Sequence, residues 1–277
     1  MRGQVTEAAA GCSVLRHTCI RAAAVRYSSF AGIRRTPANA KASTVPSLDQ
    51  ARPQSGRTTV RRIADRGRYD RETIVGILRA GTVCHVGIID EGVPLVMPMA
   101  YGVMGHELVV HGMAASRLQA ILRSGAEICV TVTVLDGIVL ARSAFEHSMN
   151  YRSVLIIGRP RWIRDRATKL AALRAVSDQM LPGRWEDIRP PDEVELRQTH
   201  VCAISLAECS AKIRTGPPEP EEHPWDTWTG VLPLSLVSGP PQPDGDRHPL
   251  PPYLASRART PQLAWEPTQT PPEGLDD

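Results

Sequence analysis

The sequence lacks the signatures of the common nucleotide-dependent, hydrolytic and zinc-dependent enzymes. It contains no GxGxxG dinucleotide fingerprint, no P-loop, no GxSxG nucleophile elbow and no HExxH zinc motif. His85, His111, His147 and His200 are not spaced as a metal cluster. We therefore expect no metal site, and each of these histidines taken alone is expected to be structural.

Paired cysteines and long apolar runs are missing as well. None of the six cysteines forms a CxxC pair, and three lie in apolar, strand-like runs, which favours buried reduced thiols over disulfides or zinc ligands. No apolar run approaches the roughly 18 residues of a membrane-spanning helix. Aromatic residues make up only 4% of the chain, so aliphatic residues must fill any core.

The charge is not that of a nucleic-acid binder. The net charge is only +4, and the arginines are spread along the chain rather than gathered in a stripe with aromatic residues. We therefore expect a small, anionic ligand as the partner, with neither nucleic acid nor a membrane.

The N-terminal segment differs from the rest. Glu7 is the only acidic residue before Asp49, whereas arginine, alanine and serine are frequent. This composition is typical of an organelle transit peptide. We expect residues 1–56 to be a disordered basic extension that targets the protein to mitochondria and is cleaved near Ser28 or Ser29; without such targeting, a cytoplasmic location is expected.

The C-terminal segment is rich in proline. Fifteen of the 24 prolines lie between Pro217 and Pro272, which leaves residues 57–216 to form a single core. Residues 217–257 carry an apolar cluster that includes Trp225 and Trp228, so an irregular strap packed on this core is expected. Residues 258–277 have too little apolar surface to offset ordering and are expected to be a flexible tail.

The central region shows the pattern of a mainly β fold. Its periodicity predicts helices over Arg71–Leu78, Ala114–Leu122 and Arg166–Met180. Between them, β-branched runs predict six or seven antiparallel strands, with tight turns at Asp90–Gly92 and at Asp136-Gly137. Because the strands follow one another without crossover helices, a small closed barrel is expected rather than a doubly wound sheet.

Prolines mark two irregular strands. Val93–Val103 contains Pro94 and Pro98, so this strand must lie at a sheet edge or be bulged. Tyr151–Ile163 predicts one long strand with a bend near Gly158 and Pro160.

The segment His111–Arg117 has the composition of a phosphate site. A strand ends at Gly112, small residues follow, and a helix is expected to begin near Ser116 and Arg117. Backbone N–H groups at a helix start, a hydroxyl and a guanidinium together suit a dianion. The alternative is that Ser116 only caps the helix and Arg117 is a solvated surface residue.

A second polar segment, Ala141–Val154, holds two Arg-Ser pairs in a loop between apolar strands. Polar loops on a rigid scaffold often carry function, although a solvated hairpin loop has the same composition.

Together these segments resemble a known family. The family is that of the FMN-binding split-barrel flavoproteins, which are pyridoxamine-5′-phosphate-oxidase-like, and in particular its nitroimidazole-resistance-like branch. Its motifs are similar in order to His111–Arg117, Leu135–Ser143, Ser148–Ser153 and Ser210–Pro217. The resemblance runs from about Arg61 to Gly216 and continues through Trp225–Leu234. It implies a six-stranded antiparallel Greek-key split barrel with short peripheral helices, which forms a homodimer and holds FMN between its subunits.

The resemblance also implies roles for single residues. The implied cofactor-binding set consists of Pro98, Met99, Ala100 and Tyr101 along the isoalloxazine edge, Ser116 and Arg117 at the phosphate with His111 and Gly112 before them, Tyr151, Arg152 and Ser153 beside the cofactor, and Lys212 near the ring or phosphate. Related split barrels bind haem or deazaflavin in the same region, where His111 would be an axial ligand or proton donor. The basic phosphate segment and the substrate-clamping C-terminal strand of true pyridoxamine-phosphate oxidases are missing, so oxidation of vitamin B6 is not implied.

The expected function is that of an FMN-dependent oxidoreductase acting on a small electron-poor substrate. The cofactor carries the redox chemistry in such proteins, which accounts for the missing catalytic motifs. The alternatives are a non-catalytic flavin- or haem-binding module and a structural dimer without a cofactor.

Overall fold

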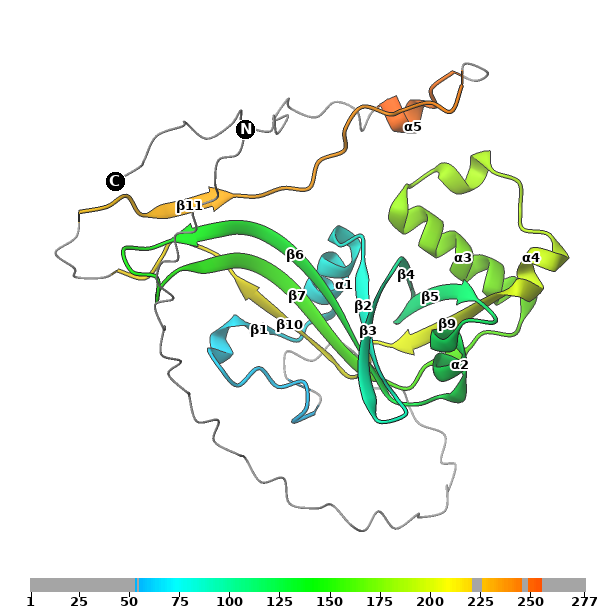
Figure 1. The fold of residues 1–277 in the computed structure, drawn as a ribbon, viewed down its shortest axis with the longest axis horizontal. Coiled ribbons are helices and arrows are strands. Elements are labelled where there is room, and N and C mark those ends of the chain that lie inside the picture. The colour runs from blue at the N-terminus through cyan, green and yellow to red at the C-terminus, as the bar shows by residue number, and fades with distance from the viewer. Residues whose placement is uncertain (1–52, 54, 221–225, 246–248, 256–277) are drawn as a thin grey trace, which may run out of the picture. The chain divides into compact units, whose positions relative to one another are not determined.

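The computed structural model describes residues 53, 55–220, 226–245 and 249–255. These residues form mainly antiparallel sheets with a few helices (Figure 1), which confirms the expected fold class. The expectations for the transit peptide, Trp225 and the flexible tail fall outside the described residues. No helix within the described ranges combines the length and the apolar character that a membrane crossing needs.

The larger sheet has the strand order β1-β10-β7-β6-β2-β3, and β11 pairs with β6. Its strands are β1 (Gly67–Arg68), β2 (Cys84–Asp90), β3 (Val93–Met99), β6 (Ile128–Leu140), β7 (Ser148–Gly158), β10 (Cys209–Arg214) and β11 (Gly230–Pro233). The β2–β3 turn is confirmed, with Glu91 and Gly92 both at positive φ (49° and 82°). β3 lies at the sheet edge, as expected for a strand with two prolines.

The smaller sheet has the order β4-β5-β9-β8. Its strands are β4 (Tyr101–Met104), β5 (Glu107–Met113), β8 (Arg161–Trp162) and β9 (Thr199–Ser205). The chain passes between the sheets at Ala100 and at Arg159-Pro160. The prediction of one strand over Tyr151–Ile163 was therefore wrong in part: the bend at Pro160, which cannot donate to a ladder, sends β8 into the other sheet.

The predicted tight turn at Asp136-Gly137 was also wrong. β6 runs through these residues with a register shift between Leu135 and Gly137, and the chain reverses later, between Leu140 and Ser148. The Asp136 carboxylate accepts hydrogen bonds from Arg152 at 2.7 and 2.9 Å. A Cβ at Gly137 would lie 3.0 Å from the Leu232 carbonyl oxygen of β11, so this glycine admits a neighbouring strand.

The helices are α1 (Arg71–Ala80), α2 (Arg117–Ser124), α3 (Arg166–Met180), α4 (Glu193–Gln198) and α5 (Pro252–Ala255), with 3₁₀ turns η1 (Ala64–Arg66) and η2 (Arg184–Asp187). Asp70, Ser116, Asp165 and Asp192 cap the first four, each side chain accepting from a backbone N–H. α3 has the predicted bounds. α2 begins three residues later than predicted, because Ala114 and Ala115 form a turn before the cap.

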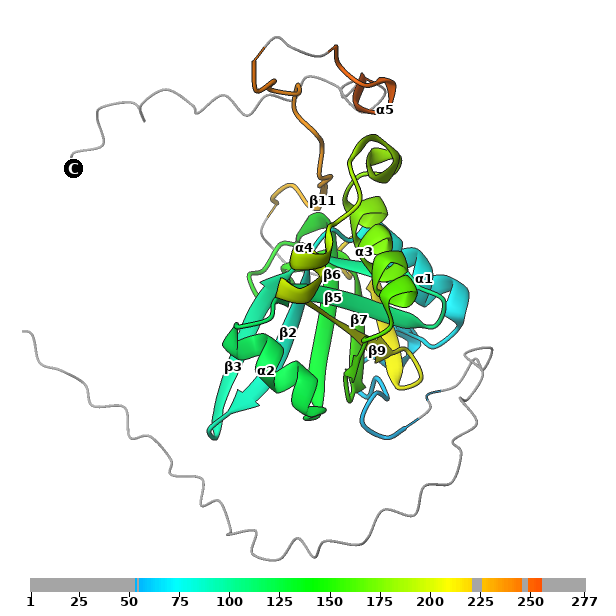
Figure 2. The same cartoon turned by 90° about the vertical axis from the view of Figure 1, so that its right-hand side faces the viewer.

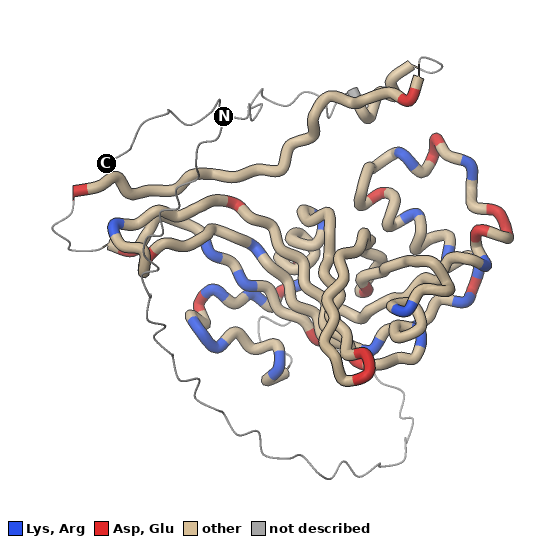
Figure 3. The backbone as a smooth tube through the Cα atoms, in the orientation of Figure 1, with Lys and Arg blue, Asp and Glu red and all other residues tan. Residues whose placement is uncertain are grey.

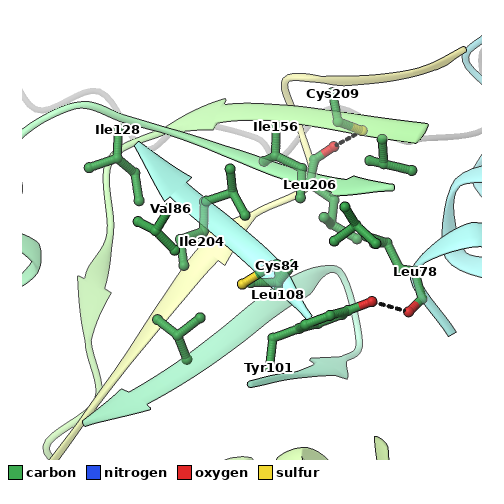
Figure 4. Packing of buried hydrophobic residues seen from close by; sticks show 14 of the residues in the cluster. Leu78, Cys84, Val86, Tyr101, Leu108, Ile128, Ile156, Ile204, Leu206 and Cys209 are labelled. Atoms are coloured by element: carbon green, nitrogen blue, oxygen red, sulfur yellow. Dashed lines mark hydrogen bonds between the residues drawn. The ribbon is translucent and has the colours of Figure 1, made fainter. Parts of the chain in front are cut away.

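The main core lies where α1 meets the two sheets. It is built of aliphatic residues and cysteines, and the Tyr101 hydroxyl donates to the Leu78 carbonyl at its edge (Figure 4). The four cysteines in the described residues are free and buried or half-buried, as expected for reduced thiols.

A second apolar cluster attaches α3 to the smaller sheet (Figure 2). Val109 of β5 and Val176 of α3 are fully or almost fully buried in it. Gly102 of β4 permits this contact, because a Cβ there would lie 2.5 Å from the backbone carbon of Ala175. The face of β5 that carries Val109 therefore packs against α3.

Candidate functional site

The segment His111–Arg117 forms the turn that joins β5 to α2. Ala114 N–H donates to the Gln198 carbonyl at 2.7 Å, and Ser116 N–H donates to the Met113 carbonyl at 2.9 Å. The Ser116 hydroxyl oxygen accepts from Gln119 N–H at 3.3 Å. The expected strand, turn and helix start are therefore confirmed, and Ser116 is a helix cap.

Arg117 is held in place by a residue that sequence reasoning missed. Its Nε donates to the carboxylate of Asp90, at the end of β2. The Arg117 side chain is 65% exposed and that of Asp90 only 15%, so the carboxylate anchors a guanidinium that still faces solvent. Asp90 belongs to the Asp90–Gly92 turn sequence, far from Arg117 along the chain, so no local sequence pattern could predict this ion pair.

His111 lines a cavity of about 570 Å³ together with Gly112, Met113, Ala114, Ala115, Glu195, Gln198 and Thr199. Its Nδ1 is buried without a hydrogen-bond partner among the described residues. Burial lowers the pKa of the His111 imidazole, so the ring is neutral at pH 7. A neutral imidazole is the form that binds a metal or haem iron.

Further buried polar atoms meet at Gly112. Gly112 pairs with His200 across β5 and β9, and a Cβ on Gly112 would lie 2.8 Å from Gln119 Nε2. Within the described residues, both amide atoms of Gln119 and His200 Nδ1 lack a partner. Unsatisfied buried polar groups are costly, so this end of β5 is suited to contact something outside the chain. Gln119 was not predicted because it lies within an ordinary amphipathic helix pattern.

Three other predicted residues share the outer face of the larger sheet. The strand register places Ser153 of β7 opposite Thr133 of β6 and Lys212 of β10, and Ser153 Oγ donates to the Lys212 carbonyl at 3.4 Å. Tyr151 lies two residues from Ser153 and so on the same face. Arg152 points to the opposite face, where it binds Asp136.

The Pro98–Tyr101 segment lies where the chain leaves the larger sheet. Pro98 pairs with His85, which in turn pairs with Thr131, so Pro98 belongs to the face that carries Ser153. The Tyr101 side chain is buried in the core, which leaves only its backbone for a cofactor. The pairing of Tyr101 with Val110 puts Ala100 beside His111.

The predicted residues thus form two groups within the described chain. One is the β5–α2 turn, with His111, Gly112, Ser116 and Arg117; the other is the outer sheet face, with Pro98, Tyr151, Ser153 and Lys212. The outer face also exposes large apolar side chains, including Val83, Ile89, Val96 and Leu135. An antiparallel barrel split into two sheets, with such a face left open, is the architecture of the flavin-binding split barrels.

The family follows from the sequence match. The family model described as pyridoxamine 5′-phosphate oxidase matches residues 70–213. The chain belongs to this family, whose fold binds flavin.

The chain is also similar to several solved structures. The flavocytochrome Anf3 from Azotobacter vinelandii is 40% identical with a TM-score of 0.69, covering 74% of this chain and 98% of its own. A FAD- and haem-binding protein from Mycobacterium smegmatis is 33% identical with a TM-score of 0.66, covering 69% and 97%. A 5-nitroimidazole antibiotic resistance protein from Bacteroides thetaiotaomicron is more distant, at 24% identity and a TM-score of 0.45, covering 52% and 84%. A search of curated protein sequences found no match.

Proposed function

We propose that the protein binds FMN as a homodimer and uses it as a redox enzyme on a small electron-poor substrate. The observation that carries the proposal is Arg117, which Asp90 holds at the first residue of α2. Bound flavin supplies hydride or electron transfer. The chain supplies the cation, the helix start and the sheet face that hold and orient the cofactor.

The residues at the α2 start fit a flavin phosphate. The first N–H groups of a helix have no partner within it, and the helix dipole favours an anion there. Ser116 uses its hydroxyl oxygen as an acceptor for Gln119 N–H, so its hydrogen remains available to a phosphate. Asp90 engages Arg117 through Nε, and the other guanidinium N–H groups remain as donors.

The outer sheet face supports a homodimer. Ile89 of β2 is 61% exposed, and Val96 of the edge strand β3 is 64% exposed. Contiguous exposed apolar surface of this kind marks an interaction site. A second copy of the chain on this face would cover these side chains and enclose Tyr151, Ser153 and Lys212 with a flavin ring.

The redox role is tested by anaerobic spectroscopy of the FMN-loaded protein. The flavin is reduced by dithionite without excess, and a nitroimidazole is then added. We expect the oxidised flavin spectrum to return at a rate above that of free reduced FMN. A reduced holo-protein that transfers electrons no faster than free FMN would contradict the enzyme and support a binding module.

Haem at His111 is the second candidate, and a specific observation favours it. His111 presents a neutral imidazole to a cavity of about 570 Å³, a size usual for small-ligand sites. Its Nδ1 is buried, whereas Nε2 is not among the buried unpartnered atoms and is the nitrogen left to bind iron. Of the similar proteins above, one is described as a flavocytochrome and another as a FAD- and haem-binding protein.

Titrations with FMN, FAD and haem separate these cofactors. If His111 binds haem, His111→Ala should abolish the Soret band while flavin binding persists, and His106→Ala, which changes an exposed histidine in the turn between β4 and β5, should leave both unchanged. A Soret band that survives His111→Ala would remove His111 as the ligand.

A further inference from the structure

We propose that a second pocket, bounded by β8, α3 and α4, binds a small organic phosphate. The pocket has a volume of about 390 Å³ and contains none of the residues assigned to the flavin. Its walls are formed by Trp162, Ile163, Arg164, Arg166, Lys169, Glu193, Leu196, Arg197 and His200. The inference does not depend on the proposed function.

The charge of the pocket is strongly positive. Four of the lining residues are cationic and only Glu193 is anionic. In the part of the chain that contains α3 and α4, Figure 3 shows Lys and Arg together with Asp and Glu. Glu193 neutralises Arg166 through a 2.9 Å ion pair in which both side chains are more than 60% exposed. Arg164 and Arg197 have no ion-pair partner among the residues the structure describes. Unpaired cations around a concave site concentrate anions there.

Trp162 provides a flat apolar wall. The Arg164 guanidinium lies 4.2 Å from the centroid of the Trp162 ring, and that of Arg123, from α2, lies 5.6 Å away. The Trp162 and His200 ring centroids are 5.2 Å apart, with the rings tilted by 55°. Stacking against an aromatic ring holds a guanidinium in a defined orientation.

His200 adds an unsatisfied polar group to the wall. It is only 8% exposed, and its Nδ1 is buried without a hydrogen-bond partner in the described chain. Burial lowers the pKa of His200, and Arg123 and Lys169 lower it further. Lys169 is itself fixed, since its ammonium donates to the Leu196 carbonyl. The His200 imidazole thus has a buried nitrogen without a hydrogen-bond partner, and the charged groups around it are cations. An anion in the pocket would interact favourably with the imidazole and with these cations.

These features define the ligand class. Arg164 and Arg197 supply the paired donors that a phosphate prefers, whereas Trp162, Ile163 and Leu196 form apolar walls for an organic part. A phosphate monoester with a flat ring therefore matches the pocket better than inorganic phosphate or an uncharged ring.

Isothermal titration calorimetry of the purified, full-length protein tests the proposal. The probes are phenyl phosphate, inorganic phosphate and phenol, at constant ionic strength. We expect saturable binding of phenyl phosphate, weaker binding of phosphate and none of phenol. No saturable binding of phenyl phosphate would overturn the proposal.

Matched variants locate the binding. Replacing both Arg164 and Arg197 by Gln should weaken phenyl phosphate at least tenfold. Arg174→Gln is the control, because Arg174 lies on α3 but is paired with Asp178 and Glu186; it should have no effect. An equal loss in the control, or a loss in Arg117→Ala as large as in the double variant, would assign the binding elsewhere and refute the site.

Discussion

Replacing Arg117 by alanine should weaken FMN binding and leave riboflavin binding unchanged. The two ligands differ only in the phosphate, so their ratio isolates the contact assigned to the α2 start. Arg117 is exposed and anchored by Asp90, so the change removes a donor without opening a cavity.

The size of the effect follows from the type of contact. A hydrogen bond to a charged group contributes roughly 1.5–3 kcal/mol, and about 1.4 kcal/mol corresponds to tenfold in affinity. Because the Arg117 side chain is 65% exposed, we expect the lower end, which is about tenfold. Asp90→Asn should act in the opposite direction. Asparagine keeps an acceptor oxygen for Arg117 Nε, whereas the carboxylate that it replaces repels a nearby phosphate by about 1 kcal/mol in a solvated site. FMN should then bind a few-fold more tightly.

Quenching of flavin fluorescence measures both affinities in one titration. Arg159→Gln is the control, because this exposed arginine lies at the other end of α2, where it donates to the Gly125 carbonyl at 3.1 Å. The reasoning is refuted if Arg117→Ala leaves FMN affinity unchanged, or if FMN and riboflavin weaken equally.

Three further predictions test the fold and the interface. Val96→Glu should give a monomer by light scattering, with weakened flavin binding. Val194→Glu, at an exposed position of α4, should remain dimeric. A dimeric Val96→Glu variant would show that the interface lies on another surface. Gly102→Ala should lower the free energy of unfolding by about 1–3 kcal/mol, because the added Cβ overpacks against Ala175. Gly76→Ala should raise it by up to about 1 kcal/mol, because Gly76 lies in α1 and a Cβ there meets no neighbouring atom. Denaturant unfolding measures both changes. Burial lowers the folded-state pKa of His111, so its contribution to stability is present above the unfolded pKa of about 6.5 and is lost as pH falls below it. His111→Phe should flatten that dependence, and an unchanged slope would contradict the burial.

Local signals predicted much of the fold. The cap at Asp165 and the spacing of apolar residues located α3, and the Asp90–Gly92 turn located the β2–β3 hairpin. Asp136-Gly137 does not form the predicted tight turn, because both residues make tertiary contacts within a continuous strand. Arg152 binds the carboxylate and β11 occupies the space above the glycine, and neither neighbour is visible in a local window.

The site was predicted in part for the same reason. The β5–α2 turn is a local feature, and its residues were found from composition and resemblance. Asp90 and Gln119 were not, because their roles depend on contacts between distant segments. The strap is an intermediate case. β11 pairs with β6, yet Trp228 stays 67% exposed, so this pairing does not bury the Trp228 side chain.

The most direct test of the central claim is the absorption spectrum and molar mass of the protein purified without added cofactor and then titrated with FMN. We expect a dimer that carries flavin or takes up FMN to one molecule per chain, with Arg117→Ala reaching that ratio only at a higher FMN concentration. A protein that stays monomeric and takes up neither FMN nor FAD would contradict it.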